Sequence, residues 1–598
     1  EMRGTRLVLG VLALTVCCAA AGRPGPALLP SIRRAAPVVS RSNARILRLK
    51  GGSAATEGGE VADAAGGGQG DAAEVDTREI TEVTQKFVTN KVHRLETYLS
   101  YLQEYQNPMV TRAWPINTNF VGNNETVTDT VFLKSMRAES KGLVYNEWVR
   151  AGPRKQTFFA PSEVNAAIVA CGGLDPGINI VVREITNTLH YGYNVKRAWG
   201  VRFGWRGFYD EAAKDWLELT QETVLHIHKE GGSVLGYSTD QCNVEQVLNV
   251  LEERGVNMLF LLGNVDACRD AHAIQMGAVA RKMKLSVIMT PKSIENNFPF
   301  IDKCIGFDTI VQGAVEAIDK VLLAASSVQN GIGICKLGSG SMCLHAVLAS
   351  GSADVCLLKA VPFEPRVVFE YVAKVVQRKG YCIVVVEDGA GEDHVKKWVA
   401  KMVEGTEKRV PCGGSVDECV GKLPSPQHHH AESEIKPQSE ARPQTGTKDW
   451  GEFAAFDIGQ FLKESVIAYF AGLNVPVTVR LSTPEWYIRS MPAMASDRIF
   501  CTVVASNVVH SAFAGFMDLV IGRVNQRYVY IPIESVLNPK HKPLISESSR
   551  MYNRMIRATG QPSFQRLGQA KLITGRGDVR RAFTPNELLS ELKNKGGQ

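Results

Sequence analysis

The chain has 598 residues, 44% of them hydrophobic, so it is long enough to bury more than one sizeable core, and two or three domains are expected. Its formal net charge is +7, but nine Lys or Arg and a single acid lie in the first 50 residues. The rest of the chain carries 59 basic and 60 acidic residues, a net charge of −1. This balance excludes a strongly basic body and gives no indication of a nucleic-acid or membrane surface.

The first 50 residues have the layout of two successive targeting segments. Arg3 and Arg6 precede an apolar run of about 15 residues that ends in small residues, as in a cleaved secretory signal peptide over residues 1–22. A transmembrane anchor is the alternative, but the run is short for a bilayer span. Residues 23–50 are rich in Arg and lack acids, which is typical of a transit peptide. Together they predict delivery to a plastid (chloroplast), with plain secretion as the alternative, and no membrane span in the mature chain.

Three further segments lie outside the expected catalytic body. Residues 51–76 are mainly Gly, Ala, Glu and Asp, and carry too little apolar surface to fold, so we expect a flexible linker. Ile80 to Tyr105 place apolar residues at helical spacing, which predicts an amphipathic helix in an N-terminal helical extension over residues 77–129. Residues 561–598 are expected to form a C-terminal tail.

From residue 166 onward, apolar strands alternate with helices of about 10 to 15 residues, which predicts a parallel, helix-covered sheet and an α/β fold. A surface insertion, rich in Pro, Ser, Gly, Gln and His, interrupts this pattern over residues 403–450. Its three consecutive histidines, His428 to His430, match no standard zinc spacing, so a solvated loop is favoured over a metal site. The expected strands are Met258–Leu262, Leu285–Met289, Gly331–Leu337, Val355–Leu358 and Tyr381–Val386, and the expected helices run from near Ile178, from Thr220 to Glu230, Val244 to Arg254, Ala271 to Met283 and Thr309 to Ala325.

A glycine pair, Gly172 and Gly173, ends the first of the buried strands. Glycine lets the backbone turn tightly there, so its N–H groups can approach phosphate oxygens, and the helix that starts near Ile178 adds its positive end. An ordinary structural turn is the alternative when the pair is taken by itself.

Several motifs carry a resemblance to one known family. Residues 291–299 read P-K-S-I-E-N-N-F-P, residues 204–209 read G-W-R-G-F-Y, and residues 484–489 read P-E-W-Y-I-R. The first resembles the P-K-T-I-D-N-D-I-P loop of the phosphofructokinase family, the second its G-Y-R-G-F-Y segment, and the third a closing segment of its plant-type members. The resemblance runs in collinear order over residues 130–560. It implies two stacked Rossmann-like domains with the active-site cleft between them, and phosphoryl transfer from ATP, with Mg²⁺, to fructose 6-phosphate in glycolysis.

The resemblance also assigns roles to residues. Glu295 stands at the position of the general base, with Ser293 beside it in the same loop. The expected phosphate-binding positions for the nucleotide are Gly172, Gly173, Gly263 and Lys292. The expected substrate-binding positions are Arg480, Arg489, Asp388 and Trp486; guanidinium groups suit bidentate phosphate contact, although surface arginines more often pair with Asp or Glu.

Several catalytic positions depart from the family pattern. Glu295 is one methylene longer than the family's Asp, and a displacement of about 1 Å can cost about a hundredfold in rate. Asn297 has no charge to offer magnesium. Val265 stands where the family's G-G-D-G loop has a metal-organising carboxylate, and Asp266 could replace it as a metal ligand only with local rearrangement.

Further departures cluster at the same site. Thr239 matches a nucleotide-contacting Arg, Gly340 matches a substrate Arg, Asp388 is shorter than the family's Glu, and Trp205 replaces a Tyr. We therefore expect a protein that binds a sugar phosphate with impaired or lost kinase activity, as a homo- or hetero-oligomer with phosphofructokinase-type subunits. One alternative is a non-catalytic regulatory or structural subunit of a plastid assembly. The other is a pyrophosphate-dependent enzyme, favoured by Asp266 with Lys292 and disfavoured by Val265.

Overall fold

The structure, a computed structural model, describes residues 86–111, 119–129, 144–210, 215–392, 457–541 and 545–564. The expected signal peptide, transit peptide, linker and surface insertion, and all of the tail beyond residue 564, lie outside these residues.

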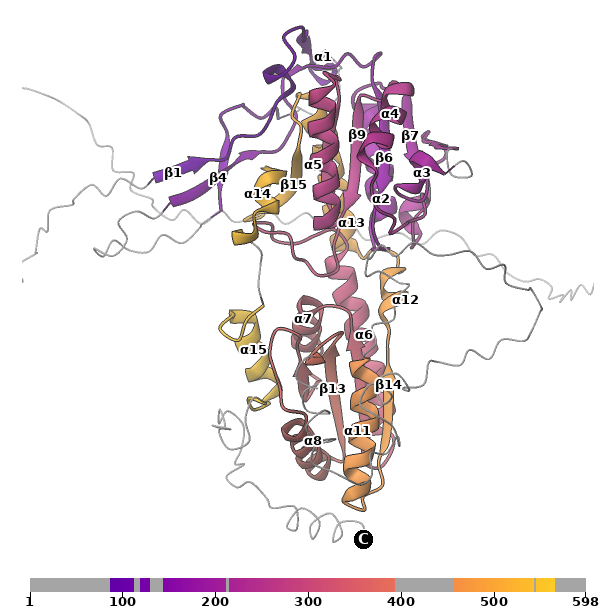
Figure 1. Cartoon of the computed structure of the whole chain (residues 1–598), viewed down its shortest axis with the longest axis vertical. Helices are drawn as coiled ribbons and strands as arrows, with labels where there is room; N and C mark the ends of the chain where they lie inside the picture. Colours follow the sequence, from indigo (N-terminus) through magenta and orange to yellow (C-terminus); the bar gives the residue numbers. More distant parts are fainter. Residues whose placement is uncertain are drawn as a thin grey trace, which may run out of the picture. The chain divides into compact units, whose positions relative to one another are not determined.

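The larger sheet has ten strands in the order β1-β4-β16-β15-β10-β9-β6-β7-β8, with β3 paired to β4 (Figure 1). Its central strands β15, β10, β9, β6 and β7 are parallel, and every residue of β6, β9 and β10 is buried. Strands buried on both faces need helices on both sides, which explains their nearly continuous apolar sequence. The strands are β1 (Lys86–Thr89), β3 (Thr126–Thr128), β4 (Val144–Arg150), β6 (Asn165–Ala170), β7 (Arg197–Val201), β8 (Leu217–Glu218), β9 (Met258–Gly263), β10 (Ser286–Pro291), β15 (Leu519–Val524) and β16 (Arg527–Pro532).

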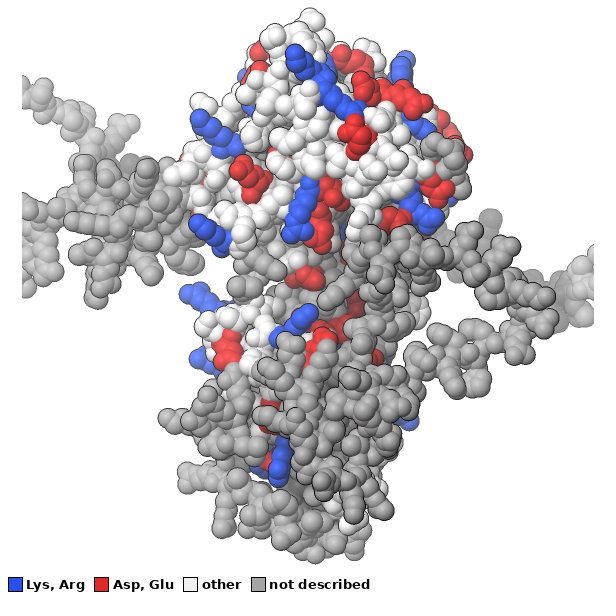
Figure 2. Space-filling view, viewed as in Figure 1, with Lys and Arg blue, Asp and Glu red and all other residues white. Residues whose placement is uncertain are grey.

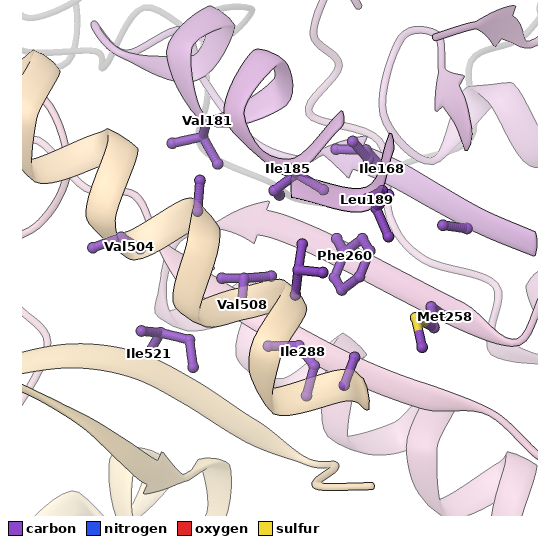
Figure 3. Packing of buried hydrophobic residues seen from close by; sticks show 14 of the residues in the cluster. Ile168, Val181, Ile185, Leu189, Met258, Phe260, Ile288, Val504, Val508 and Ile521 are labelled. Atoms are coloured by element: carbon purple, nitrogen blue, oxygen red, sulfur yellow. The ribbon is translucent and has the colours of Figure 1, made fainter. Parts of the chain in front are cut away.

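Two helices, α2 (Ile178–Asn187) and α13 (Ala495–Phe513), cover one face of this sheet. Figure 3 shows Val508 of α13 beside Ile288 and Phe260 of the central strands, and Val504 of the same helix belongs to the same buried cluster. The other face is covered by α4 (Val244–Glu253), α5 (Val265–Ala280) and α14 (Ile533–Leu537). Figure 2 shows Lys and Arg interspersed with Asp and Glu on the visible face of this part of the molecule, as the even charge balance predicts.

The smaller sheet has four parallel strands in the order β12 (Val355–Leu357), β13 (Tyr381–Glu387), β11 (Gly331–Leu337) and β14 (Thr478–Ser482). One of its faces packs on α8 (Pro365–Lys379) and α11 (Ile458–Gly472). The other packs on α6 (Phe307–Ser326) and α7 (Gly340–Ser350), and α15 (Arg550–Thr559) lies on α7. The short elements are η1 (Leu95–Thr97), β2 (Tyr105–Gln106), α1 (Pro108–Thr111), β5 (Gln156–Thr157), η3 (Thr188–Gly192), α3 (Arg206–Tyr209), η4 (Ile227–Lys229), α12 (Glu485–Arg489) and η5 (Pro539–His541).

Each parallel sheet has a point where the direction of its crossovers reverses. In the larger sheet β6 has the next strand, β7, on one side and β9 on the other. In the smaller sheet β11 lies between β13 and β14. Loops that follow the strands at such a switch point are where ligands bind in α/β proteins. We call residues 171–177, 264–266 and 292–299 the first loop cluster, and residues 338–340, 387–389 and 483–489 the second.

The expected α/β fold and its parallel, helix-covered sheets are confirmed. The strands expected at 258–262, 285–289, 331–337, 355–358 and 381–386 are β9 to β13, and the helices expected near 178, 244–254, 271–283 and 309–325 are α2, α4, α5 and α6. No helix in the part of the chain that the structure describes is long and apolar enough to cross a membrane.

Two helix predictions are wrong. Residues 86–89, within the helix expected over 80–105, form β1 because they pair in parallel with β4. Of the residues at helical spacing, Leu95 and Leu99 are buried. They lie at the single turn η1 and pack into the core on the face of the larger sheet that α2 and α13 cover. Between Thr220 and Glu230 only η4 is helical, and turns form the rest. In both segments, packing of a few side chains overrides local propensity.

Candidate active site

The glycine pair after β6 lies beside the loops that follow β9 and β10. Gly172 has a left-handed φ of 78°, and a Cβ added there would lie 3.9 Å from Lys292 Nζ and 4.0 Å from Asn264 Cγ. The backbone N–H of Lys292 donates to the Gly263 carbonyl at 2.8 Å, and its ammonium donates to the Gly173 carbonyl at 2.5 Å. The structure therefore brings together the four residues expected to bind nucleotide phosphates.

Lys292 is not free to receive an anion. Its side chain is buried, with 1% of the residue exposed, and Nζ lies 3.0 Å from Asp175 Oδ2. Asp175 is itself only 3% exposed. A buried ammonium needs a negative partner, and here the chain supplies it from the same loop that carries the glycine pair.

The residues after β9 do not offer a metal ligand to this loop. Asn264 caps α5, and its side chain accepts a hydrogen bond from the Ala267 N–H at 3.0 Å. Val265 packs against the core on the face of the larger sheet that α4, α5 and α14 cover. The Asp266 side chain is 75% exposed and pairs with Arg269 one turn along the helix. Asp266 thus pairs with Arg269, and Lys292 with Asp175, so the pairing of Asp266 with Lys292 that the pyrophosphate alternative needs is not formed.

The loop after β10 forms a local hydrogen-bond network around the expected base. Ser293 Oγ donates to Asn297 Oδ1 at 3.0 Å, and Asn297 Nδ2 donates to Glu295 Oε2 at 2.6 Å. The backbone N–H of Glu295 donates to Ser293 Oγ at 3.2 Å. A carboxylate at position 297 would repel Glu295, whereas the amide binds it. Asn297, which stands where the resembled loop has Asp, is therefore a hydrogen-bond partner of Glu295.

The second loop cluster is acidic. Glu485 begins α12, and a Cβ added to Gly338 would lie 2.7 Å from its carboxylate. Burial raises the pKa of Glu387, although N–H groups of Lys359 and Gly340 oppose the rise. Asp388, expected to bind substrate, is half exposed at its side chain and lies 3.4 Å from Lys336 Nζ. Sequence reasoning missed Glu387; the signal was a second carboxylate at the end of the same buried strand.

The two arginines expected to hold a substrate phosphate occupy different environments. Arg480 is an exposed residue of the edge strand β14, and among the described residues it makes no ion pair. Arg489, at the end of α12, donates to Glu485 Oε1 at 2.8 Å and lies 3.5 Å from Asp175 Oδ1. Trp486 is 67% exposed. The structure thus joins Arg489 to the first loop cluster but does not bring Arg480 into this network.

The donor set does not fit a magnesium ion. Within residues 86–392 and 457–564, gaps excepted, no group of three or more His, Cys, Asp or Glu side chains could hold a metal. Mg²⁺ demands near-octahedral oxygen coordination, usually from one or two carboxylates with substrate phosphates. The three nearest candidates, Asp175, Glu295 and Asp266, each bind another side chain of the protein.

Comparison with known proteins finds similar sequences and structures. The profile of the phosphofructokinase family, described as "Phosphofructokinase", matches residues 165–512. ATP-dependent 6-phosphofructokinase 5, chloroplastic, of Arabidopsis thaliana is 35% identical over 425 residues, 70% of this chain and 70% of that protein. ATP-dependent 6-phosphofructokinase 1 of the same plant is 32% identical over 470 residues, 77% of this chain and 88% of that one. A solved pyrophosphate-dependent phosphofructokinase from Marinobacter aquaeolei gives a TM-score of 0.46 at 16% identity, over 70% of this chain and all of that one.

The matched segment begins at β6, the strand that leads into the glycine pair, and ends within α13. It therefore contains both loop clusters. With a family profile over more than half of the chain and plant relatives above 30% identity, the chain belongs to the phosphofructokinase family and is a member of its plant type.

Proposed function

We propose that this protein binds a sugar phosphate of the fructose 6-phosphate kind and that its transfer of phosphoryl groups from ATP is impaired or lost. The observation that carries the proposal is the donor set: the carboxylates near the glycine pair are bound to side chains of the protein itself. Phosphoryl transfer depends on positioning and on neutralising the charge of the phosphates, for which kinases use metal ions. A site whose described carboxylates are engaged by other side chains has less to offer such a metal ion, and so loses part of that stabilisation.

The acceptor side supports binding. Arg480 presents an exposed guanidinium without an ion-pair partner in the described chain, and Trp486 lies a few residues further on with an open ring. A guanidinium binds phosphate through charge-assisted hydrogen bonds, and an exposed aromatic ring offers a face to the apolar side of a sugar. The relatives named above are 6-phosphofructokinases, which supports a sugar phosphate as the ligand.

Two measurements on the purified protein test the proposal. Calorimetry with fructose 6-phosphate is expected to show saturable binding, and a coupled assay with ATP and Mg²⁺ is expected to show turnover at least about a thousandfold below the roughly 1–100 s⁻¹ of kinases. Pyrophosphate is expected to do no better as donor. A normal rate with either donor would refute the impaired-enzyme part, and absence of sugar-phosphate binding would refute the other.

A non-catalytic subunit of a larger assembly is the second candidate. Large apolar side chains are exposed on and beside α12 and the start of α13: Trp486 by 67%, Met494 by 37% and Ile499 by 68%. Neighbouring exposed apolar side chains mark protein contact surfaces more often than isolated ones do. Co-purification from the native source would test it, since a stable complex with an active phosphofructokinase-type subunit is expected, and a monomer would count against it.

We also propose that the protein acts in a plastid. The Arg-rich, acid-free composition of residues 23–50 and the chloroplastic relative both support this location. Mass spectrometry of the mature protein is expected to place its first residue near 45–55. Peptides from residues 7–21 in the mature form would refute the signal peptide.

A further inference from the structure

Asp175 lies where the two buried cations of the candidate site meet. Its Oδ2 is 3.0 Å from Lys292 Nζ, and its Oδ1 is 3.5 Å from Arg489 Nη1. The side chains of Asp175, Lys292 and Arg489 are 4%, 2% and 13% exposed. Both carboxylate oxygens thus face positive charge in a region from which water is almost excluded.

The same two cations also bind the backbone of the loop that carries Asp175. Lys292 donates to the carbonyl of Gly173, and Arg489 Nη1 lies 3.4 Å from the carbonyl of Leu174. Arg489 comes from α12 of the second loop cluster, whereas Asp175 belongs to the first. The carboxylate is therefore an ionic link between the two loop clusters: Oδ2 accepts a hydrogen bond from Lys292, and Oδ1, which has no hydrogen-bond partner, lies within ion-pair distance of Arg489.

The formal charge of this group is balanced. Lys292 and Arg489 contribute two positive charges, while Asp175 and Glu485, which pairs with Arg489, contribute two negative ones. A phosphoryl donor that approached Gly172 and Gly173 would bring further negative charge to a site where both of these cations, Lys292 and Arg489, are already paired with carboxylates. It would have to displace the Asp175 carboxylate, or remain beside it in a region of low dielectric constant.

We propose that Asp175 is a built-in anion: its carboxylate takes the place beside the glycine pair where the terminal phosphate of a donor would be neutralised, and it determines the rejection of ATP and pyrophosphate by this site. The inference rests on the proposed function, because it explains the loss of donor use at the same site. The proposal is separate from the question of metal ligands. The latter concerns carboxylates that are not open to a metal ion, whereas the proposal concerns a negative charge placed beside the glycine pair.

The test is the variant Asp175→Asn, which keeps the shape and removes the charge, probed with metal-free pyrophosphate. Asp354→Asn is the matched control, because Asp354 is also mostly buried, pairs with Lys379 at 2.6 Å and accepts the Ile383 N–H, but belongs to the smaller sheet outside both loop clusters. Calorimetry gives the affinity for pyrophosphate, and thermal unfolding with and without pyrophosphate gives the stabilisation that it provides.

We expect Asp175→Asn to unfold at lower temperature than the wild type in phosphate-free buffer, because the buried Lys292 loses its carboxylate partner and Arg489 is left with Glu485, and to recover on adding pyrophosphate. Its affinity for pyrophosphate should exceed that of the wild type and of Asp354→Asn by about tenfold or more. Equal affinity in all three proteins would overturn the proposal. If Asp175→Asn is recovered unfolded, it is refolded in the presence of pyrophosphate. Recovery of the folded protein would support the proposal, and failure to refold would overturn it. Binding of fructose 6-phosphate to the wild type, measured separately, tests the proposed function and not this inference.

Discussion

Two cations at the candidate site, Lys292 in the first loop cluster and Arg480 on the strand before the second, have opposite environments. In the first, the cation Lys292 is buried, and its charge is already neutralised by Asp175. On the strand that leads into the second, the cation Arg480 is exposed and unpaired within the described chain. A site that transfers phosphoryl groups needs open positive charge on the donor side as well as on the acceptor side. Of these two cations, Arg480 is open in the described residues and Lys292 is not.

This contrast indicates how such a protein could lose catalysis and keep its fold. The donor-side groups still sit where the strands place them, since Gly172, Gly173, Gly263 and Lys292 contact one another. Two side chains near them are already bound within the chain: Asn297 binds Glu295, and Asp175 binds Lys292. Side chains that bind each other stabilise the folded chain, whereas side chains left open for a ligand are costly when the ligand is absent.

The largest expected effect is the restoration of donor use. We predict that a triple variant, Glu295→Asp with Asn297→Asp and Val265→Asp, still has low turnover with ATP and Mg²⁺, although it supplies metal and base groups. Adding Asp175→Asn to it should raise turnover by about a hundredfold, because this fourth change opens the donor side. The residues of one active site act as a unit, so single changes should recover little. A coupled assay measures the rates.

Gly340→Arg is left out of this design for a structural reason. A Cβ at Gly340 would lie 2.8 Å from the Glu387 carboxylate and 2.9 Å from Ile545 Cδ1, so an arginine would displace both side chains. If the first three changes alone restore a normal rate, the donor side was never closed by Asp175, and the contrast between the two loop clusters fails.

The second prediction measures the strength of the buried ion pair. Lys292→Met should lower the free energy of unfolding by about 3 kcal/mol, because removal of one partner leaves the Asp175 carboxylate buried with Arg489 alone. The double variant Lys292→Met with Asp175→Asn should recover most of this loss. Chemical denaturation of the four proteins of the cycle gives the coupling energy. A coupling near zero would mean that the pair does not hold the loop.

Features of the fold and of the candidate site could be predicted from the sequence where the residues that interact lie close together along the chain. The strands β9 and β10 were predicted from their apolar runs, and the loop after β10 from a local motif. The motifs assign no role to Asp175. Its partners, Lys292 and Arg489, lie more than 100 and 300 positions away, and nothing in a linear motif says which cation a buried carboxylate will meet.

The errors have a similar cause. The helical spacing of Leu95 and Leu99 was correct as a sign of burial, but the segment before them pairs with β4, and a strand partner is invisible in the spacing. The carboxylate that Gly340 contacts is Glu387, which the sequence motifs did not single out, and the assignment of its neighbour Asp388 to substrate binding stays a prediction. Adjacent residues at the end of a strand point to opposite faces, so a shift of one position changes which side chain enters the site.

The third prediction concerns the stability that is lost when a buried titratable side chain has no ionic partner. Lys292 avoids this loss because it pairs with Asp175. Burial lowers the pKa of His510 from 6.5 to about 4, with a further contribution from Arg154, and its Nδ1 lies 2.9 Å from the Tyr193 hydroxyl. The unfolded chain therefore takes up this proton first as the pH falls. The stabilisation is complete above about pH 6.5 and is lost progressively toward pH 4.

Between pH 7 and pH 5 this residue alone should remove about 2 kcal/mol of stability. The free energy of unfolding of the wild type and of His510→Gln is measured by denaturation at both pH values. The difference between their losses gives the contribution of His510, because the variant retains every other titrating group. If the wild type and the variant lose the same amount of stability, His510 is protonated in the folded protein and burial by itself is less costly than we argue.

The smallest effect concerns the acceptor side, and it divides the two arginines. Arg480→Ala should weaken fructose 6-phosphate binding by about tenfold, roughly 1.4 kcal/mol, without changing the stability of the fold, because its guanidinium is exposed and unpaired in the described residues. Arg489→Ala should lower stability more than binding, since Arg489 already holds Glu485 and Asp175. Wild-type binding should weaken with added salt, and the salt dependence should be smaller in Arg480→Ala, because exposed charges are the ones that salt screens. Calorimetry at two salt concentrations and thermal unfolding of both variants distinguish the roles. If Arg489→Ala instead abolishes binding while Arg480→Ala leaves it intact, the ligand enters at the ionic link between the loop clusters, and Asp175 must give way when the sugar phosphate binds.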